Sequence, residues 1–236
     1  MSAAWLGALE RLILPPTCLL CGAAGAAGLD LCVGCLGDLP RNFAACPRCA
    51  TPLPEGWNGP CVGCRSQPPA FDRAFVPFRY RPPLDFLIVR LKFGGHLASA
   101  RLLGELFAAA LIERGDPPPE GIVPVPLHPR RLRERGFNQS LELARAAAHR
   151  LKIPLWIDGL RRVRHTVPQT RLDARQRQTN LSGAFALDAP LPGTRIALMD
   201  DVVTTGGTVA ECARVLRDGG ATEIEIWAIG RAGFDP

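Results

Sequence analysis

Apolar residues after position 70 recur at two spacings, and each spacing predicts one type of element. Alternation or short apolar runs, typical of strands, occur at residues 74–80, 122–127, 195–199 and 223–229. Spacings of three and four, typical of helices, occur at residues 84–93, 98–113, 140–151 and 208–218. Strands that alternate with helices predict an α/β fold, in which helices cover both faces of a mostly parallel sheet.

The first 16 residues also have a helical apolar pattern. One face carries Trp5, Leu6, Leu9, Leu12 and Ile13. We expect a short amphipathic helix that ends before Pro15. A signal peptide is not expected, because no basic residue precedes the apolar part and no small-residue cleavage site follows it. Apolar runs stay well short of the roughly 18 residues of a membrane span, so we expect a cytoplasmic protein without a transmembrane segment.

Eight of the nine cysteines form four C-x-x-C pairs between residues 18 and 64. The pairs are Cys18/Cys21, Cys32/Cys35, Cys46/Cys49 and Cys61/Cys64. A zinc ion takes four thiolates at about 2.3 Å, and one C-x-x-C turn supplies two of them. Sequence order predicts two structural four-cysteine zinc sites, although interleaved pairing and iron–sulfur clusters use the same ligands. Metal binding would supply much of the folding free energy of this apolar-poor segment.

Other uses of the cysteines fit less well. A disulfide framework is disfavoured without an export signal, and a redox-active C-x-x-C would need only one pair. The composition changes after residues 67–69, which predicts two domains. Residues 1–70 would hold the N-terminal helix and a double zinc ribbon, and residues 71–236 the α/β domain. The ninth cysteine, Cys212, is expected to be a small buried residue in a helix.

Positive charge is concentrated in the middle of the chain. The formal net charge is +6, and residues 121–180 alone contribute +9, whereas residues 1–70 are neutral. Lys92 and Lys152 are the only lysines, so the basic residues are almost all arginine, which suits bidentate contact with phosphate. Such focusing indicates a polyanionic partner, either the phosphates of a small molecule or a nucleic acid backbone.

The strand predicted at 195–199 is followed by two carboxylates and a loop that opens a helix. Asp200 and Asp201 can accept hydrogen bonds from vicinal hydroxyls. The loop consists of Thr204, Thr205, Gly206, Gly207 and Thr208. Loop amides at a helix N-terminus form an anion site, and the glycines let the backbone close around a phosphate. A sugar phosphate matches both ends; the alternative is a capped helix beside surface carboxylates.

The string R-I-A-L-M-D-D-V-V-T-T-G-G-T at 195–208 resembles the phosphoribosyl pyrophosphate (PRPP) motif of type I phosphoribosyltransferases. Nearly the whole chain resembles the ComF family of competence-associated phosphoribosyltransferase-like proteins. That likeness rests on L-L-C-G and the cysteine pairs, L-K-F-G-G-H at 91–96, V-P-V-P-L-H-P-R-R-L-R-E-R-G-F-N-Q at 123–139, and R-x-T-x-x-Q-T-x-L-x-x-x-x-R-x-x-N-x-x-G-A-F at 164–185. It implies a type I phosphoribosyltransferase fold preceded by a zinc-ribbon module, and a role in uptake of transforming DNA.

The resemblance also implies roles for particular residues. At least one of the arginines that follow the strand at 122–127 would hold pyrophosphate, and the candidates are Arg130, Arg131, Arg133 and Arg135. The polar stretch 165–182 matches a mobile catalytic loop that excludes water, with Gln169, Arg175 and Arg177 as candidates. Mg²⁺ would be held chiefly by PRPP oxygens and water. We expect His128 to pack or cap a helix, and Asn138 and Gln139 to begin the next one.

Two hypotheses on function follow. The first is a PRPP-binding phosphoribosyltransferase that acts on an acceptor the sequence does not identify. The second is a single-stranded nucleic-acid-binding protein in which PRPP is a regulatory ligand or the site is a non-catalytic relic. Partners under these hypotheses are PRPP, single-stranded DNA and other DNA-uptake proteins. Phe43 and Trp57 are the only plausible stacking aromatics between the first and last cysteines of the pairs, which favours the first hypothesis.

Overall fold

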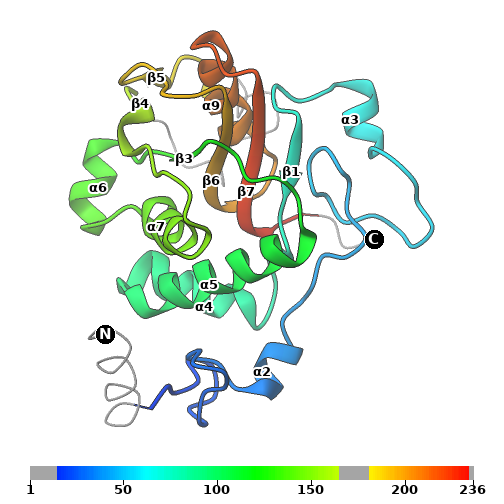
Figure 1. Cartoon of the computed structure of the whole chain (residues 1–236), viewed down its shortest axis with the longest axis vertical. Helices are drawn as coiled ribbons and strands as arrows, with labels where there is room; N and C mark the ends of the chain where they lie inside the picture. Colours follow the sequence, from blue (N-terminus) through cyan, green and yellow to red (C-terminus); the bar gives the residue numbers. More distant parts are fainter. Residues whose placement is uncertain (1–14, 165–180, 234–236) are drawn as a thin grey trace.

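The computed structural model describes residues 15–164 and 181–233, in which a cysteine-rich segment precedes an α/β fold (Figure 1). The helices are α2 (Val33–Gly37), α3 (Val62–Ser66), α4 (Leu84–Gly94), α5 (Leu97–Arg114), α6 (Pro129–Arg135), α7 (Gln139–Leu151), the 3-10 turn η1 (Ile157–Gly159) and α9 (Gly207–Asp218). The strands are β1 (Arg73–Phe75), β2 (Phe78–Arg79), β3 (Gly121–Pro124), β4 (Leu160–Arg162), β5 (Phe185–Leu187), β6 (Arg195–Val203) and β7 (Glu223–Arg231). The four helices predicted after residue 70 are therefore confirmed. The N-terminal helix predicted within residues 1–16 falls almost wholly outside the described residues.

The main sheet is parallel, as predicted. Its order is β1-β7-β6-β3, and β2 pairs with β7 beyond β1. In register, Leu198 of β6 lies between Ile226 of β7 and Val123 of β3. The strand predicted at 74–80 is instead two short strands. Pro77 interrupts it, because proline has no N–H to donate to a neighbouring strand and its carbonyl accepts from the backbone N–H of Asn42 in the cysteine-rich segment.

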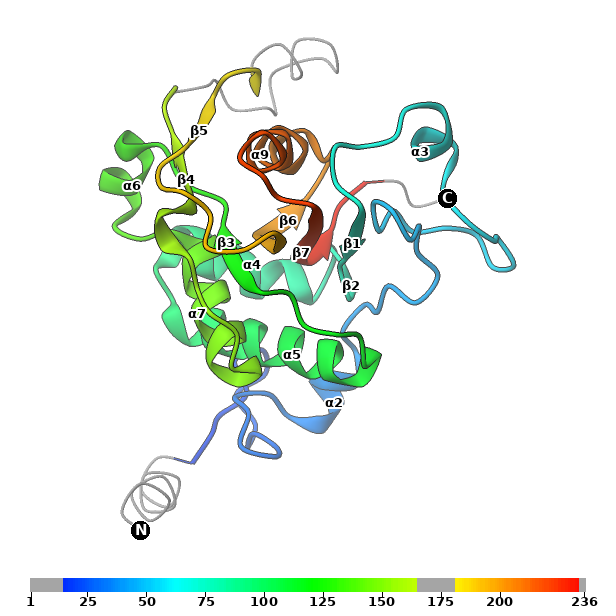
Figure 2. The same cartoon turned by 45° about the horizontal axis from the view of Figure 1, so that its top comes forward.

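A second, antiparallel pair was not predicted. It consists of β4 and β5, and Leu160 lies opposite Leu187. Each strand has only three residues, too few to produce a periodic pattern. The pair lies between α6 and α9 in Figure 2.

Helices cover both faces of the main sheet, as the α/β prediction requires. Figure 2 shows α4, α5 and α7 on one face and α9 on the other. The buried run of β6 divides between them: Ala197 and Met199 join the core under α5 and α7, whereas Leu198 joins the core under α9. Cys212 is fully buried in that second core, as predicted.

The cysteine-rich segment is anchored to the α/β part at separate places. Arg90 of α4 donates to the carbonyl of Leu19 at 3.3 Å, and Arg101 of α5 pairs with Asp30. Farther along, the Asn42 side chain donates to the carbonyls of Ala50 and Val76. The domain boundary at residues 70/71 stays a prediction. Among residues 15–164 and 181–233, no helix has both the length and the apolar character needed to cross a bilayer.

Candidate functional site

The phosphate loop, residues Thr204–Thr208, joins the end of β6 to the start of α9. Gly206 is the N-cap residue and has φ +81°, a conformation that glycine adopts without strain. No side chain caps this 12-residue helix, so its first amides stay directed at the loop. A helix N-terminus of this kind attracts an anion. The structure therefore places the five predicted loop residues together around one helix end.

Asp200 and Asp201 lie within β6, two strand positions before the loop. The hydroxyl of Ser140 donates to Asp200 Oδ1 at 3.0 Å, and the backbone N–H of Asp201 donates to the same oxygen at 2.8 Å. Ser140 is at the start of α7. The sequence predicted the carboxylates but gave no role to the serine.

Asp201 is held by two side chains that the sequence analysis did not assign. Lys92 Nζ of α4 lies 3.1 Å from Asp201 Oδ1, and Gln139 Nε2 of α7 donates to Oδ2 at 3.1 Å. Both partners belong to the segments quoted for the family resemblance, L-K-F-G-G-H and F-N-Q. Gln139 Oε1 is buried and accepts no hydrogen bond from the described residues. The network thus leaves one buried oxygen acceptor beside the carboxylates.

The start of α7 explains why Gln139 and Ser140 reach the carboxylates. Asn138 is the N-cap, as predicted: its side chain accepts from Ser140 N and donates to the carbonyl of Val125. His128 caps α6, also as predicted, by accepting from Arg130 N at 3.2 Å. Both caps fix helix starts on the segment that follows β3.

Burial, together with the neighbouring charge of Asp201, raises the pKa of Asp200 to about 7. The Asp201 N–H, Lys92 and Ser140 act in the opposite direction. Between the ordinary carboxyl pKa and about 7, the folded chain holds a proton that the unfolded chain has lost. The contribution of Asp200 to the free energy of unfolding therefore decreases as pH rises through this window.

Asp200→Asn is accordingly expected to stabilise the fold at alkaline pH. The amide oxygen still accepts from Ser140 and from the Asp201 N–H, and the buried charge is gone. The melting temperature of the variant should exceed that of the wild type at about pH 8.5, by about 2–4 °C per kcal/mol, and the excess should shrink toward about pH 6. Differential scanning calorimetry at both pH values tests this. A difference that grows toward acid pH would contradict the assignment.

The four arginines predicted for pyrophosphate lie on α6, and the structure separates them. Arg135 lies over the ring of Phe93, 5.5 Å from its centroid. Burial lowers the pKa of its guanidinium, while the charge of Asp201 raises it and that of Arg131 lowers it. Arg131 and Arg135 line a hollow of about 290 Å³ together with Lys92. Neither Arg130 nor Arg133 lines this hollow, and Arg130 pairs with Glu134, which does line it.

Arg162 of β4 is a cation that sequence analysis missed. It lies over Phe185 of β5 at 5.2 Å. Burial lowers the pKa of its guanidinium, Arg131 lowers it further, and Asp200 acts to raise it. The charges of four basic side chains therefore act on the two carboxylates or on one another: Lys92, Arg131, Arg135 and Arg162. The arginine run at residues 161–164 was the only sequence sign of this position.

The predicted catalytic-loop residues, Gln169, Arg175 and Arg177, lie outside the described residues. The segment that contains them connects β4 to β5. Near its end, the Gly183 N–H donates to Glu211 of α9 at 2.7 Å, and Glu211 pairs with Arg214. These contacts attach the return of the segment to the helix that follows the phosphate loop.

The eight paired cysteines form two clusters, in the sequential pairing that was predicted. Each set has ligand atoms within 4.8 Å of one another: Cys18, Cys21, Cys32 and Cys35, then Cys46, Cys49, Cys61 and Cys64. The sulfurs of Cys21 and Cys32 are 3.7 Å apart, as are those of Cys49 and Cys61. A tetrahedron with bonds of about 2.3 Å has edges of about 3.8 Å, so both sets fit zinc.

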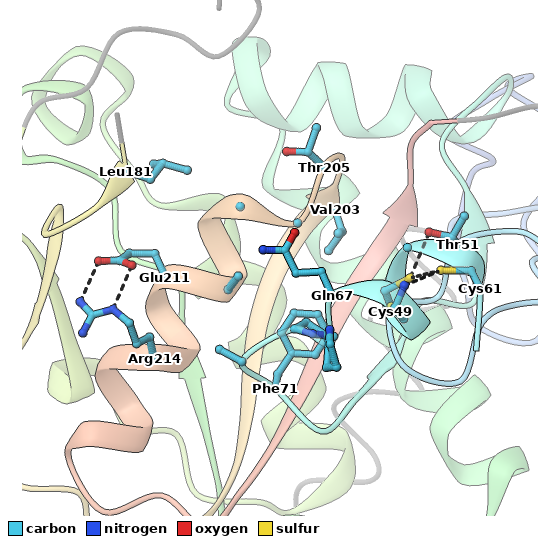
Figure 3. Close-up of a pocket in the computed structure, with 18 of the residues that line it drawn as sticks. Cys49, Thr51, Cys61, Gln67, Phe71, Leu181, Val203, Thr205, Glu211 and Arg214 are labelled. Carbon is cyan, nitrogen blue, oxygen red and sulfur yellow. Dashed lines mark hydrogen bonds and ion pairs between the residues drawn. The ribbon is translucent and has the colours of Figure 1, made fainter. Parts of the chain in front are cut away.

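Hydrogen bonding favours the thiolate at one cysteine of each cluster. Burial acts to raise the pKa of Cys18, yet backbone groups of Cys32, Cys21 and Leu20 lower it to about 6. In the second cluster, burial is likewise outweighed by Thr51, whose hydroxyl lies 3.1 Å from Cys49 Sγ (Figure 3), and the pKa of Cys49 falls to about 7. The pKa of Cys35 is instead raised by its hydrogen bonds to Cys21 and Cys32, and that of Cys64 by burial and by Cys49. Metal ligation requires the deprotonated form.

Arg231, at the end of β7, connects the second cluster to the phosphate loop. Its guanidinium is buried and donates to the carbonyl of Cys49 at 3.0 Å and to the hydroxyl of Thr51 at 2.8 Å. The same group donates to the carbonyls of Val203, at 3.0 Å, and Thr204. One side chain thus spans from a metal-ligand residue to the loop.

Comparison with known proteins finds a profile that matches the cysteine-rich segment and relatives that match nearly the whole chain. A family profile described as "Double zinc ribbon domain" matches residues 9–65. The "DNA utilization protein YhgH" of Salmonella typhi is 38% identical over 226 residues, covering 93% of this chain and 99% of that protein. The "Competence protein F" of Haemophilus influenzae is 35% identical over 223 residues, covering 91% and 96%.

Three further comparisons are more distant. The "Competence protein ComFC" of Streptococcus pneumoniae is 26% identical over 230 residues, covering 91% of this chain and 99% of that protein. Among solved structures, a purine phosphoribosyltransferase from Pyrococcus horikoshii has TM-score 0.33 and 17% identity over 56% of this chain and 81% of that chain. A glutamine PRPP amidotransferase from B. subtilis has TM-score 0.36 and 20% identity over 55% and 25%. These scores are too low to assign a site.

Proposed function

We propose a function from one premise: this chain belongs to the ComF family, which includes competence protein F and the DNA utilization protein YhgH. Its α/β part binds PRPP, and its two cysteine clusters each bind one zinc ion. The bound PRPP donates phosphoribose to an acceptor. By analogy with the names of its relatives, we place this activity in the uptake or processing of transforming DNA.

One observation carries the proposal: the paired carboxylates Asp200 and Asp201 stand two residues before a loop that caps a helix N-terminus. The loop amides suit the 5-phosphate of PRPP. The carboxylates suit the two vicinal ribose hydroxyls as acceptors. One sugar phosphate is therefore bound at both ends by adjacent residues of a single strand–loop–helix unit.

Arginines near the carboxylates would bind the pyrophosphate group of PRPP. Arg131, Arg135 and Arg162 come from two elements, α6 and β4, and the charge of Asp201 acts to raise the pKa of Arg135. Guanidinium groups bind phosphate oxygens in bidentate fashion. Their charge would stabilise the pyrophosphate as it leaves.

The oxygen atoms around the carboxylates also suit Mg²⁺. Oxygen ligands are what this ion prefers, and Gln139 Oε1 is a buried oxygen without a partner among the described residues, beside Asp201. Mg²⁺ bound with PRPP would neutralise phosphate charge. The protein residues do the remaining work: Ser140 and Gln139 orient the carboxylates, and Lys92 balances their charge.

Calorimetric titration of PRPP with Mg²⁺ tests this function. The wild type should bind, and the variant Asp200→Asn/Asp201→Asn should bind at least about a hundredfold more weakly, because two charge-assisted hydrogen bonds are lost. Asp218→Asn, which removes an exposed carboxylate of the same strand–loop–helix unit, is the control and should bind like the wild type. A wild type that binds no PRPP would overturn the proposal.

A second candidate function is single-stranded nucleic acid binding. It is favoured by the arginines of α6, of which Arg130 and Arg133 are exposed and Arg131 is half-buried, and by the names of the relatives. Arg131 also lies close to the candidate pyrophosphate site, so the two functions share a residue. Absence of PRPP binding in the titration would put this second function first.

A further inference from the structure

Helix α4 carries an exposed apolar stripe opposite its buried face. Phe86 is 48% exposed, Val89 43% and Phe93 77%, and spacings of three and four place these residues on one side of the helix. We call these three residues the α4 stripe. Exposed apolar surface that is continuous in this way marks an interaction site. The opposite side of the helix is fully buried in the core, through Leu84, Leu87, Ile88 and Leu91.

Two arginines lie over the aromatic rings of the stripe. The guanidinium of Arg90 is 5.4 Å from the centroid of the Phe86 ring, and that of Arg135 is 5.5 Å from the centroid of the Phe93 ring. Neither guanidinium forms an ion pair with an acidic side chain of the described residues. The border of the stripe is therefore positively charged.

The described chain begins next to this stripe. Arg90 donates to the carbonyl of Leu19 at 3.3 Å, so the side chain that lies over Phe86 also holds the start of the first ribbon, residues 18–35 (the second ribbon is residues 46–64). Cys18 belongs to the same buried core as the inner face of α4. Figure 1 shows the start of the described chain on the side of the molecule that α4 and α5 cover. Residues 1–14 therefore join the described chain beside α4.

Residues 1–14 lie outside the described residues, but their sequence matches the stripe in length. The apolar face expected there runs from Trp5 to Ile13, eight positions or about 12 Å of helix. The stripe from Phe86 to Phe93 spans seven positions, about 11 Å. From Ile13 to Leu19 the chain can extend by about 20 Å, and the Pro15-Pro16 pair ends a helix. The two apolar faces can therefore meet.

Charge complements this match. At 100° per residue, Glu10 falls at the edge of the expected apolar face and Arg11 on the opposite side. A carboxylate at that edge suits the positive border that Arg90 and Arg135 provide.

A segment of the same chain has an advantage over a separate partner at this stripe. Because the chain is anchored at Cys18 and Leu19, residues 1–14 are present at an effective concentration on the order of millimolar. A second copy of the protein would compete only at its own concentration. The occupant that these observations favour is therefore the segment itself.

We propose that residues 1–14 dock on the α4 stripe as an amphipathic helix with the apolar face inward. The docked segment covers the rings of Phe86 and Phe93 and fastens the helix that holds Lys92 next to Asp201. Phe93 also lines the hollow that contains Lys92 and two arginines of α6, so the segment borders that hollow. This contact does not depend on PRPP binding or on the proposed function.

Trypsin cleavage after Arg11 measures the docking in the full chain loaded with zinc. A protease cuts extended backbone, so a docked helix is cut only when it opens, even though Arg11 would face solvent. Mass spectrometry gives the rate of this one cut. Val89→Glu should accelerate it at least about tenfold, because the variant places a charge inside the contact.

Ile112→Glu is the matched control. Ile112 is an aliphatic residue of α5 outside the stripe and is 52% exposed, close to the value for Val89. Both side chains are half exposed, so both variants should fold. The rate of the cut after Arg11 in Ile112→Glu should equal that of the wild type.

Leu9→Glu changes the other side of the same contact. It should also accelerate the cut at least about tenfold. The double variant Leu9→Glu/Val89→Glu should be cut no more than about twofold faster than the faster single variant, because a contact already lost cannot be lost again. Effects that multiply in the double variant would show that the two residues do not share a contact, and would overturn the proposal.

Three other results would also overturn it. One is an equal rate of the cut in Val89→Glu and in the wild type. Another is a wild-type rate that falls as protein concentration rises, which would assign the stripe to a second copy. The third is protection of the wild type only in the presence of vesicles of phosphatidylglycerol and phosphatidylcholine, which would assign residues 1–14 to a lipid surface.

Discussion

Lys92→Met is expected to lower the free energy of unfolding by about 3 kcal/mol, because it leaves a buried carboxylate without its counter-charge. The Asp201 side chain is only 7% exposed, and Lys92 Nζ lies 3.1 Å from it. Asp200 is next to Asp201, so an unbalanced charge there would be repelled by a second carboxylate. Methionine retains an unbranched apolar side chain of similar length.

A second substitution identifies the cause of this loss. In the Lys92→Met background, Asp201→Asn should restore most of the lost stability, since the amide oxygen still accepts from Gln139 and carries no charge. Urea unfolding of the wild type, both single variants and the double variant gives the coupling free energy. The control is Arg130→Met, which removes an exposed pair with Glu134 and should cost no more than about 1 kcal/mol. A double variant as unstable as Lys92→Met would show that lost packing, not charge, is the cause.

Cys61→Ser is expected to weaken PRPP binding by about 5- to 150-fold, whereas Cys32→Ser should leave it nearly unchanged. Both substitutions remove the first cysteine of a C-V-G-C string and should each release one zinc ion. They differ in what the ribbon contacts. The second ribbon holds Arg231 through Cys49 and Thr51, and Arg231 holds the phosphate loop through Val203 and Thr204. The first ribbon instead contacts α4 and α5 through Leu19 and Asp30.

Coupling between two binding sites is reciprocal, which supplies a measurement that does not depend on activity. Saturating PRPP should slow the release of one of the two zinc ions to a chromogenic chelator and leave the other unaffected. In Cys32→Ser the remaining ion should be the protected one, and in Cys61→Ser the remaining ion should be insensitive to PRPP. Equal PRPP affinities in the two variants would contradict the link through Arg231.

The ribbon and the phosphate loop were both recognisable from the sequence for the same reason. Each consists of residues close together in the chain, so their spacing alone predicts the geometry. Cys46 and Cys49 lie on one tight turn, and Asp200, Asp201 and the loop follow one another between a strand and a helix. The caps at His128 and Asn138 were predictable on the same grounds, since a cap acts within three residues of its own helix start.

Contacts between distant parts of the chain were not predictable in this way. Lys92 was quoted as part of a motif but had no assigned role, because its partner lies 109 positions later in the sequence. Arg162 belongs to a three-residue strand with no periodic pattern, and Arg231 ends a strand that reads only as core. The four arginines of α6 looked equivalent until the helix had an orientation.

By itself, the sequence determined the α/β class, the parallel sheet, the two cysteine clusters in sequential order and the strand–loop–helix unit at residues 195–208. These features follow from local periodicity and from ligands on single turns. Only the tertiary structure decided which side chains surround Asp200 and Asp201, which arginines of α6 lie near them, and that the second ribbon borders the phosphate loop. Those arrangements depend on how α4, α7 and the ribbon pack against β6 and β7, and packing is set by contacts between residues far apart in the chain.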